Sequence, residues 1–404
     1  MSIPLLSSRR AAAMTGVLAL LSVFPPLATD MYLAAMGDLA AALHAGRSET
    51  ELSLSLFFLG LCLGQLVVGP LADVLGRRLP LLAGCALFTI ASGLLLATGE
   101  IAVFNALRVV QAIGACAGMV VGRAVVNDLY EGPRAAKAMT VLVMLMTLGP
   151  IAAPTLGSLL LQGFGWRSIF WCMVGVGALA FGLTLAVIPE TRARAARPAR
   201  PVPTALRHAR ALMRSRAFVV PALTAGLVQG GMFAFITGSS GVFQGVFGLG
   251  ALAYGLLFAA IAAALLAAGR LNGRLLDRFA PGAILGAGLP AYALAATATV
   301  LVSGTAQLWV FVVPLWIAIG MVGLLSANAM ALAMEAARAA AGMGSALMGA
   351  LQFGLAFAVS SAVALAAGQS ALPMSLGLLL PALAATALWH LAAPGPAPRT
   401  RARA

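Results

Sequence analysis

Charged side chains are scarce in this chain. They make up 9% of its 404 residues, whereas 62% of the residues are hydrophobic. A soluble globular domain carries about 25% charged residues, so this composition excludes the soluble enzyme of two or three domains that the length alone would suggest. The long apolar runs also exclude disorder. The class that remains is an all-α membrane protein that crosses the bilayer many times.

Acidic residues are the rarest charged class, with 11 Asp and Glu against 25 Lys and Arg, and the formal net charge is +14. In a soluble protein such a charge would suggest a nucleic-acid partner. Here the arginines lie in short breaks between the apolar runs, which is the pattern of membrane-protein loops. We therefore expect the lipid bilayer as a partner and no nucleic acid.

Residues that bind metals or nucleotides are few and scattered. No pair of cysteines or histidines has metal-ligand spacing, and no GxxxxGK[ST] loop is present. The cysteines and histidines are Cys62, Cys85, Cys116, Cys172, His44, His208 and His390. The sequence thus predicts no metal, no cofactor and no enzyme activity, so that an ion gradient or the gradient of the cargo must supply energy.

Twelve apolar runs have the length of about 20 residues that a membrane-spanning helix needs. The six in the first half are 11–36, 50–72, 79–98, 101–124, 136–162 and 167–188. The six in the second half are 217–240, 251–269, 281–303, 307–333, 341–367 and 371–393. We predict a six-helix bundle in residues 1–188, a basic linker over 189–216 and a second six-helix bundle in 217–404.

The basic residues predict the orientation. If both termini are cytoplasmic, the inner loops carry nearly all arginines, and the outer loops keep only Arg47 and Arg167. Positive loops face the cytoplasm, so we expect a multi-pass protein of the inner (plasma) membrane with both termini inside. The arginine-rich linker would then lie near anionic lipid headgroups.

Three motifs resemble those of the major facilitator superfamily. Residues 69–78 read Gly-Pro-Leu-Ala-Asp-Val-Leu-Gly-Arg-Arg, like the family's loop between spans two and three. Residues 108–114, Arg-Val-Val-Gln-Ala-Ile-Gly, resemble its second motif, and residues 149–157, Gly-Pro-Ile-Ala-Ala-Pro-Thr-Leu-Gly, resemble the motif of its proton-coupled antiporters. The break after span eight, 269–278, echoes 69–78, as expected for two parallel repeats.

Further segments resemble the Bcr/CflA-type exporters of bicyclomycin and chloramphenicol. They are Thr-Asp-Met-Tyr-Leu at 29–33, Arg-Ala-Val-Val-Asn-Asp-Leu-Tyr at 123–130 and Ser-Ala-Asn-Ala-Met at 326–330. Ala34 and Gly37 stand where these exporters often have prolines, and Ser158 where a second glycine is common. The resemblance implies the major facilitator fold and export of small drugs in exchange for protons by alternating access.

Asp30 is the one acid inside an otherwise apolar span, and Arg108 is the one basic residue well inside a span. An ionised carboxylate in hydrocarbon is costly, so Asp30 should face a water-filled cavity, pair with a cation or be protonated. With a rise of about 1.5 Å per residue, both residues come to similar depth. We expect a switchable proton-coupling pair; a purely structural carboxylate and ion pair is the alternative.

The polar face of span four is expected to line the substrate cavity, with Asn105 and Gln111 three residues before and after Arg108. Met31 and Tyr32 follow Asp30 and are expected beside it. Aromatic and neutral polar residues of the second half would form the opposite wall, although lipid-facing or core positions are the alternative for each aromatic. These residues are Gln229, Phe233, Phe235, Asn328 and Gln352.

Two further groups are assigned by motif. A gating group at the cytoplasmic side is expected to hold the inner gate shut, with plain topology-setting charge as the alternative; it comprises Gly69, Asp73, Gly76, Arg77, Arg78, Arg123 and Asp128. The antiporter helix carries small residues every four positions and two helix-bending prolines, for which plain helix packing is the alternative. Its assigned residues are Gly149, Pro150, Pro154 and Gly157.

The sequence therefore predicts a monomeric secondary transporter that exports small drugs or toxic metabolites in exchange for protons. A proton-coupled transporter of one specific metabolite with the same fold is the main alternative, because fold does not decide function. A membrane-embedded enzyme or receptor is disfavoured by the absence of an intramembrane His/Asp/Glu cluster, and a channel by the absence of a charged ring or filter-like loop.

Overall fold

The computed structural model describes residues 8–130, 132–192 and 201–393, and every regular element in those ranges is helical. Twelve helical stretches among them are long and apolar enough to cross a membrane, which confirms the predicted all-α membrane fold. Their limits agree with the predicted runs to within several residues. The largest differences are at the first stretch, which reaches residue 42, the seventh, which reaches residue 246, and the eighth, which reaches residue 276.

The first span is broken into short pieces, whereas the other spans of the first half are single helices. The pieces are α1 (Ser8–Ser22), α2 (Phe24–Asp30), the 3-10 turn η1 (Leu33–Ala35) and α3 (Met36–Ala42). The following helices are α4 (Arg47–Leu75), α5 (Arg78–Ala97), α6 (Ile101–Leu129), α7 (Gly132–Phe164) and α8 (Arg167–Val187).

The second half has six spans, the first of which ends in a π-helical turn. They are α10 (Arg216–Ser240) with η3 (Gly241–Val246), α11 (Ala251–Leu276), α12 (Pro281–Leu301), α13 (Leu308–Ala336), α14 (Ala341–Leu365) and α15 (Leu372–Ala392). A 3-10 turn, η4 (Arg338–Ala340), precedes α14.

The linker contains a helix that the sequence analysis did not predict, α9 (Pro201–Arg214). It contacts α10 and α14 of the second half and α4 of the first half. Leu212 anchors it in a small apolar cluster with Phe218 and Met348. Residues 193–200 of the predicted linker and the arginines at 399, 401 and 403 lie outside the described residues.

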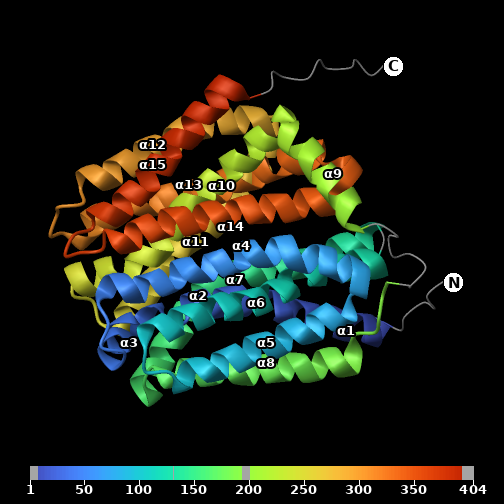
Figure 1. The fold of residues 1–404 in the computed structure, drawn as a ribbon. Coiled ribbons are helices and arrows are strands. Elements are labelled where there is room, and N and C mark those ends of the chain that lie inside the picture. Colours follow the sequence, from blue (N-terminus) through green and yellow to red (C-terminus); the bar gives the residue numbers. More distant parts are fainter. Residues whose placement is uncertain (1–7, 131, 193–200, 394–404) are drawn as a thin grey trace.

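The two halves pack side by side (Figure 1). Helices α1–α8 form one group and α10–α15 the other, and the closest approaches between them run along α4 with α14 and α7 with α11. Large apolar side chains such as Leu94, Leu179 and Leu294 are exposed on the outside. An apolar exterior of this extent fits contact with lipid, because soluble monomers rarely expose such surface.

The helix ends form two layers of different charge. One end, called here the basic end, carries the turn between α4 and α5, helix α9 and the end of α11, with Arg77, Arg192, Arg207 and Arg270 among its arginines. The opposite end carries the turn between α3 and α4 and the start of α8, with Arg47 and Arg167. The charge asymmetry seen in the sequence thus maps onto the two ends of one structure.

Candidate functional site

The break in the first span places Asp30 inside the first half. Pro25 and Pro26 occupy the first turn of α2, where a missing N–H is tolerated, and they end the continuity with α1. The helix then stops at Asp30, and the chain continues through a turn into η1. Asp30 is 1% exposed, and its Oδ1 has no hydrogen-bond partner within the described part of the chain.

Arg108 lies fully buried on α6 and does not form an ion pair with Asp30 in this structure. Its Nη2 donates to the carbonyl oxygen of Ala28 at 2.7 Å, and its Nη1 donates to the side-chain oxygen of Gln111. The guanidinium is thus held by two neutral acceptors, one of which, Ala28, lies two residues before Asp30 in sequence. The predicted direct pair is absent from this arrangement, and the proton-coupling roles stay predictions.

Two aromatic rings enclose the Arg108 guanidinium. Its carbon lies 4.5 Å from the ring centre of Tyr32 and 4.5 Å from that of Phe57. Such cation–π contacts stabilise a desolvated cation by about 2 kcal/mol. The Tyr32 hydroxyl is in turn hydrogen-bonded to Ser53 at 2.9 Å. Phe57 and Ser53, both on α4, belong to this site although the sequence analysis did not select them, because neither residue type is unusual in an apolar span.

The polar face of α6 is present, and its side-chain amide groups donate to neighbouring helices, whereas Asn105 Oδ1 has no partner among the described residues. The Gln111 amide donates to Ser92 at 2.7 Å, and the Asn105 amide donates to the backbone oxygen of Glu49 at 3.2 Å. These bonds tie α6 to α5 and α4. Of the two amides, only Gln111 contacts Arg108, so its bond to Ser92 also fixes one acceptor of the guanidinium.

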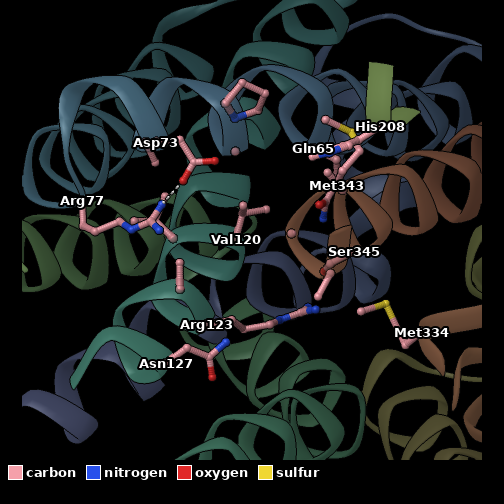
Figure 2. Close-up of a pocket in the computed structure, with 18 of the residues that line it drawn as sticks. Gln65, Asp73, Arg77, Val120, Arg123, Asn127, His208, Met334, Met343 and Ser345 are labelled. Carbon is pink, nitrogen blue, oxygen red and sulfur yellow. Dashed lines mark hydrogen bonds and ion pairs between the residues drawn. The ribbon is translucent and has the colours of Figure 1, made fainter. Parts of the chain in front are cut away.

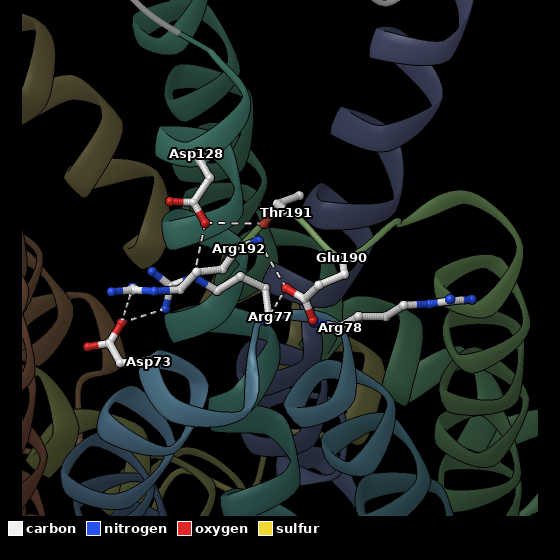
Figure 3. Close-up of polar contacts among 7 residues, drawn as sticks. All are labelled: Asp73, Arg77, Arg78, Asp128, Glu190, Thr191 and Arg192. Carbon is white, nitrogen blue, oxygen red and sulfur yellow. Dashed lines mark hydrogen bonds and ion pairs between the residues drawn. The ribbon is translucent and has the colours of Figure 1, made fainter. Parts of the chain in front are cut away.

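A charge cluster at the basic end joins three of the predicted gating residues (Figure 3). Arg77 donates to Asp73 at 2.9 Å and to Asp128 at 3.0 Å, and it is only 7% exposed. Gly76 has φ 97°, a conformation that glycine adopts without strain, and it turns the chain from α4 into α5. The described partners belong to the first half and the start of the linker, so this cluster does not join the two halves here.

Glu190 and Arg192, at the start of the linker, complete the charge cluster and were not predicted. Glu190 accepts from the backbone N–H groups of Arg77 at 2.8 Å and Arg78 at 3.3 Å, and so caps the positive start of α5. Arg192 donates to Asp73 at 2.5 Å. The sequence feature that could have predicted them is an acidic and a basic residue directly after the sixth span. Arg123, which was predicted in the gating group, takes no part in the cluster.

The small residues of α7 allow close packing on the broken first span. A methyl group on Gly149 would meet the ring of Pro26, and one on Gly157 would overlap the backbone of Met31. Pro150 and Pro154 are buried in the same helix. One turn beyond, the Ser158 hydroxyl donates to the backbone oxygens of Pro154 at 2.7 Å and of Ala251 at 2.8 Å, so it joins α7 to α11 of the second half.

The family model of the Major Facilitator Superfamily matches residues 18–361, which is most of the chain. The chain belongs to this superfamily. It is therefore a transporter and not an enzyme, and the predicted fold is confirmed.

Relatives named for drug resistance lie in the branch that the motifs indicated. The chain is 31% identical over 327 residues to a chloramphenicol resistance protein of Pseudomonas aeruginosa, covering 78% of this chain and 74% of that protein. It is 29% identical to a bicyclomycin resistance protein homolog of Haemophilus influenzae, covering 79% and 80%. An MFS-type transporter of Bacillus subtilis, YdgK, is 34% identical over 61% of this chain and 62% of that protein. The predicted resemblance to the Bcr/CflA-type branch is thus confirmed.

Solved structures share the fold at low sequence identity. A bacterial homolog of the human lysosomal transporter Spinster, in an inward-facing conformation, superposes with a TM-score of 0.75 at 18% identity and covers 96% of this chain and 97% of that chain. A D-xylose–proton symporter superposes with a TM-score of 0.75 at 17% identity, covering 94% and 97%. These likenesses show the fold alone.

A cavity of about 470 Å³ lies at the basic end of this superfamily member, between α4, α6, α9, α13 and α14 (Figure 2). Its wall includes the predicted gating residues Gly69, Asp73, Arg77 and Arg123. None of the predicted substrate-cavity residues lines it, and their role stays a prediction. Those residues are Met31, Tyr32, Asn105, Gln111, Gln229, Phe233, Phe235, Asn328 and Gln352.

Several of those residues make contacts within or between the halves. Phe233 packs against Phe58 of the first half, with ring centres 4.4 Å apart. Phe235 stacks on Phe258, and the Asn328 amide donates to Asn272 at 2.7 Å, both inside the second half. Phe233 therefore lies at the interface between the halves, whereas Phe235 and Asn328 are engaged away from it.

At the opposite end an unpredicted arginine–glutamate pair joins the halves. Arg47 Nε donates to Glu51 at 3.0 Å, and Arg47 Nη1 donates to the backbone oxygen of Gly368 in the second half at 2.9 Å. Glu51 is 3% exposed. The guanidinium also lies against the backbone at Gly241 and Gly245 of η3, where a methyl group would collide with it. Arg47 was assigned only to an outer loop, because its distant partners have no local sequence signal.

Proposed function

We propose that this superfamily member exports small drugs or toxic metabolites across the inner membrane in exchange for protons, by alternating access. In this proposal both termini and the basic end face the cytoplasm, and the proton gradient supplies the energy without a cofactor. The protein would act as a monomer, with the halves 1–188 and 217–404 rocking about the linker 189–216.

The observation that carries the proposal is the environment of Asp30. It is a buried carboxyl group at a helix break, with one oxygen lacking a partner and a buried arginine held nearby by neutral acceptors. A group in such a place is costly as an isolated charge, which suits a site that exchanges a proton during the cycle. The relatives named for chloramphenicol and bicyclomycin resistance support drug export as the direction.

The proposed cycle couples Asp30 to the Arg108 site. Loss of the Asp30 proton leaves a carboxylate that attracts Arg108 away from Ala28 and Gln111. Protonation releases Arg108 to those neutral acceptors, as arranged in this structure. Cargo binding competes with the proton, so that one is released for the other.

The test compares wild type, Asp30→Asn and empty vector at matched expression in a host without its own exporters. Asp38→Asn is the matched control, because Asp38 is an exposed acid of the same span. Growth is measured with chloramphenicol, bicyclomycin and several cationic dyes, and dissipation of the pH gradient is measured in inside-out vesicles when drug is added.

We expect wild type and Asp38→Asn to protect the host and to move protons when drug is added. We expect Asp30→Asn to lose both activities. Undiminished exchange in Asp30→Asn would remove the proposed proton site. Failure of wild type to protect against any compound would contradict drug export and favour the transporter of one specific metabolite.

A further inference from the structure

Arg123 is a basic-end arginine without a partner among the described residues, and unlike the exposed Arg207 and Arg270 it lies in the wall of a cavity. It lies on α6, is partly buried and lines the cavity of about 470 Å³. No described residue forms an ion pair or hydrogen bond with it. Figure 2 shows its guanidinium extended into the cavity toward the side of α13 and α14, whereas neighbouring Arg77 is drawn toward Asp73.

Among the described residues, no free carboxylate in the cavity wall balances this charge. Asp73 is the one acid among the described residues that line the cavity, and it already accepts from Arg77 and Arg192. Asp128, five residues after Arg123, is held by Arg77 and Thr191. A guanidinium without a counter-charge in a partly enclosed site attracts anions.

The wall opposite Arg123 adds further positive potential. The first turn of α14, with Ala341, Gly342 and Met343, lines the same cavity. Its N-cap, Ala340, makes no side-chain capping bond, and the turn contains no acid. Free N–H groups at a helix start favour negative charge, so both walls favour a ligand of the same sign.

Part of the cavity wall is suited to an apolar body. Met139, Met334 and Met343 line it together with Val120. Methionine side chains adapt to ligands of different shape, and a cavity of this volume holds a drug-sized molecule.

We propose that Arg123 binds the negatively charged group of an acidic amphiphile, whose apolar body packs on these methionines, so that this cavity favours an organic anion over an organic cation entering from the basic end. This inference rests on the proposed export function, for which it names the cargo class. Arg123 thereby acts as a cargo-binding residue and not as part of the gate.

The experiment measures binding to the purified full-length protein in nanodiscs, with no gradient and no transport. Three dansyl probes share one apolar body and end in a carboxylate, a neutral amide or an ammonium group. Their fluorescence is titrated on wild type, Arg123→Gln, Arg123→Lys and Ser345→Asp. The control is Arg338→Gln, because Arg338 is an exposed arginine at the same end that does not line the cavity.

Wild type and Arg338→Gln are expected to bind the carboxylate probe at least tenfold more tightly than the ammonium probe. Arg123→Gln should lose about tenfold in carboxylate affinity while the amide probe changes less than threefold, and Arg123→Lys should recover part of the loss. Ser345→Asp keeps Arg123 but places a carboxylate in the same cavity wall, so it should reverse the preference.

Equal affinity of wild type for the three probes, or a preference of wild type for the ammonium probe, would overturn the inference. So would a carboxylate preference that survives in both Arg123→Gln and Ser345→Asp. Because binding needs no proton, these outcomes are separate from the Asp30 experiment. If the protein exports drugs but shows no preference for the carboxylate probe, only the inference about Arg123 is wrong. If it prefers the carboxylate probe but does not exchange drug for protons, only the proposed function is wrong.

Discussion

At the scale of the residue, the most constrained side chain is Arg108. Its guanidinium is fully buried, lies between two aromatic rings and donates to one backbone and one side-chain oxygen. A planar guanidinium can stack and donate sideways at the same time, whereas an ammonium group cannot. The site therefore requires the shape of arginine as well as its charge.

Arg108→Lys is accordingly expected to lose at least tenfold in transport, although it keeps the charge. The lysine would forfeit the stacking on Tyr32 and Phe57 and one of the two hydrogen bonds. Drug resistance and uptake into inside-out vesicles measure the effect. Wild-type transport by Arg108→Lys would show that charge alone suffices. Arg167→Lys, at an exposed position, serves as the control and should transport normally.

At the scale of the element, the packing of α7 on the broken first span depends on glycines, which have no side chain to keep the two backbones apart. Gly157 touches the backbone of Met31, and Gly149 touches Pro26. Because Met31 directly follows Asp30, this contact also sets the position of the break that carries the acid. Small residues at helix contacts allow such close approach in membranes.

Gly157→Val is expected to destabilise the protein by about 1–3 kcal/mol, since overpacking at a tight contact forces the backbones apart. Gly163→Val is the matched control on the same helix, because no atom lies within 4 Å of the added carbon there. Thermal unfolding in detergent measures both. A melting temperature of Gly157→Val equal to that of the control would contradict the role of the contact.

At the scale of the whole molecule, the halves are held together differently at the two ends. At the opposite end, Arg47 and Ser158 of the first half donate to backbone oxygens of the second. At the basic end the charge cluster stays within the first half and the start of the linker, and a cavity lies between the halves. The opposite end also has a cavity between the halves, of about 290 Å³, but hydrogen bonds join the halves there in this structure.

Arg47→Ala should shift the molecule toward opening at the opposite end. A hydrogen bond to a charged group contributes about 1.5–3 kcal/mol, so its loss should raise the open population about tenfold or more. Spin labels at Gln162 and Ala306, both exposed at that end, report the distance between the halves. Arg167→Ala is the control, since Arg167 contacts Trp166 of its own half. An unchanged distance distribution would argue against Arg47 as a closing contact.

Much of the fold followed from composition and periodicity. Each apolar run of about 20 residues has one favourable structure in lipid, a helix that satisfies its own backbone hydrogen bonds. The twelve spans were therefore predicted closely, and the rare intramembrane charges Asp30 and Arg108 stood out. Helix α9 was not predicted, because a short arginine-rich amphipathic helix resembles a polar linker in composition.

Partner choice was decided by the tertiary structure alone. The sequence indicated a pair between Asp30 and Arg108 because the two residues lie at similar depth in the membrane. Depth does not determine which way a side chain points around its helix, and in the structure Arg108 donates to the neutral oxygens of Ala28 and Gln111 instead. Glu190 joined Arg77, and Arg47 joined Gly368, across more than a hundred residues each. The sequence determined the spans, the charge asymmetry and the family, because these depend on local apolarity and on the order of the motifs. Only the tertiary structure decided that Arg123 has no partner among the described residues and that Arg47 joins the two halves, because both depend on which distant groups meet.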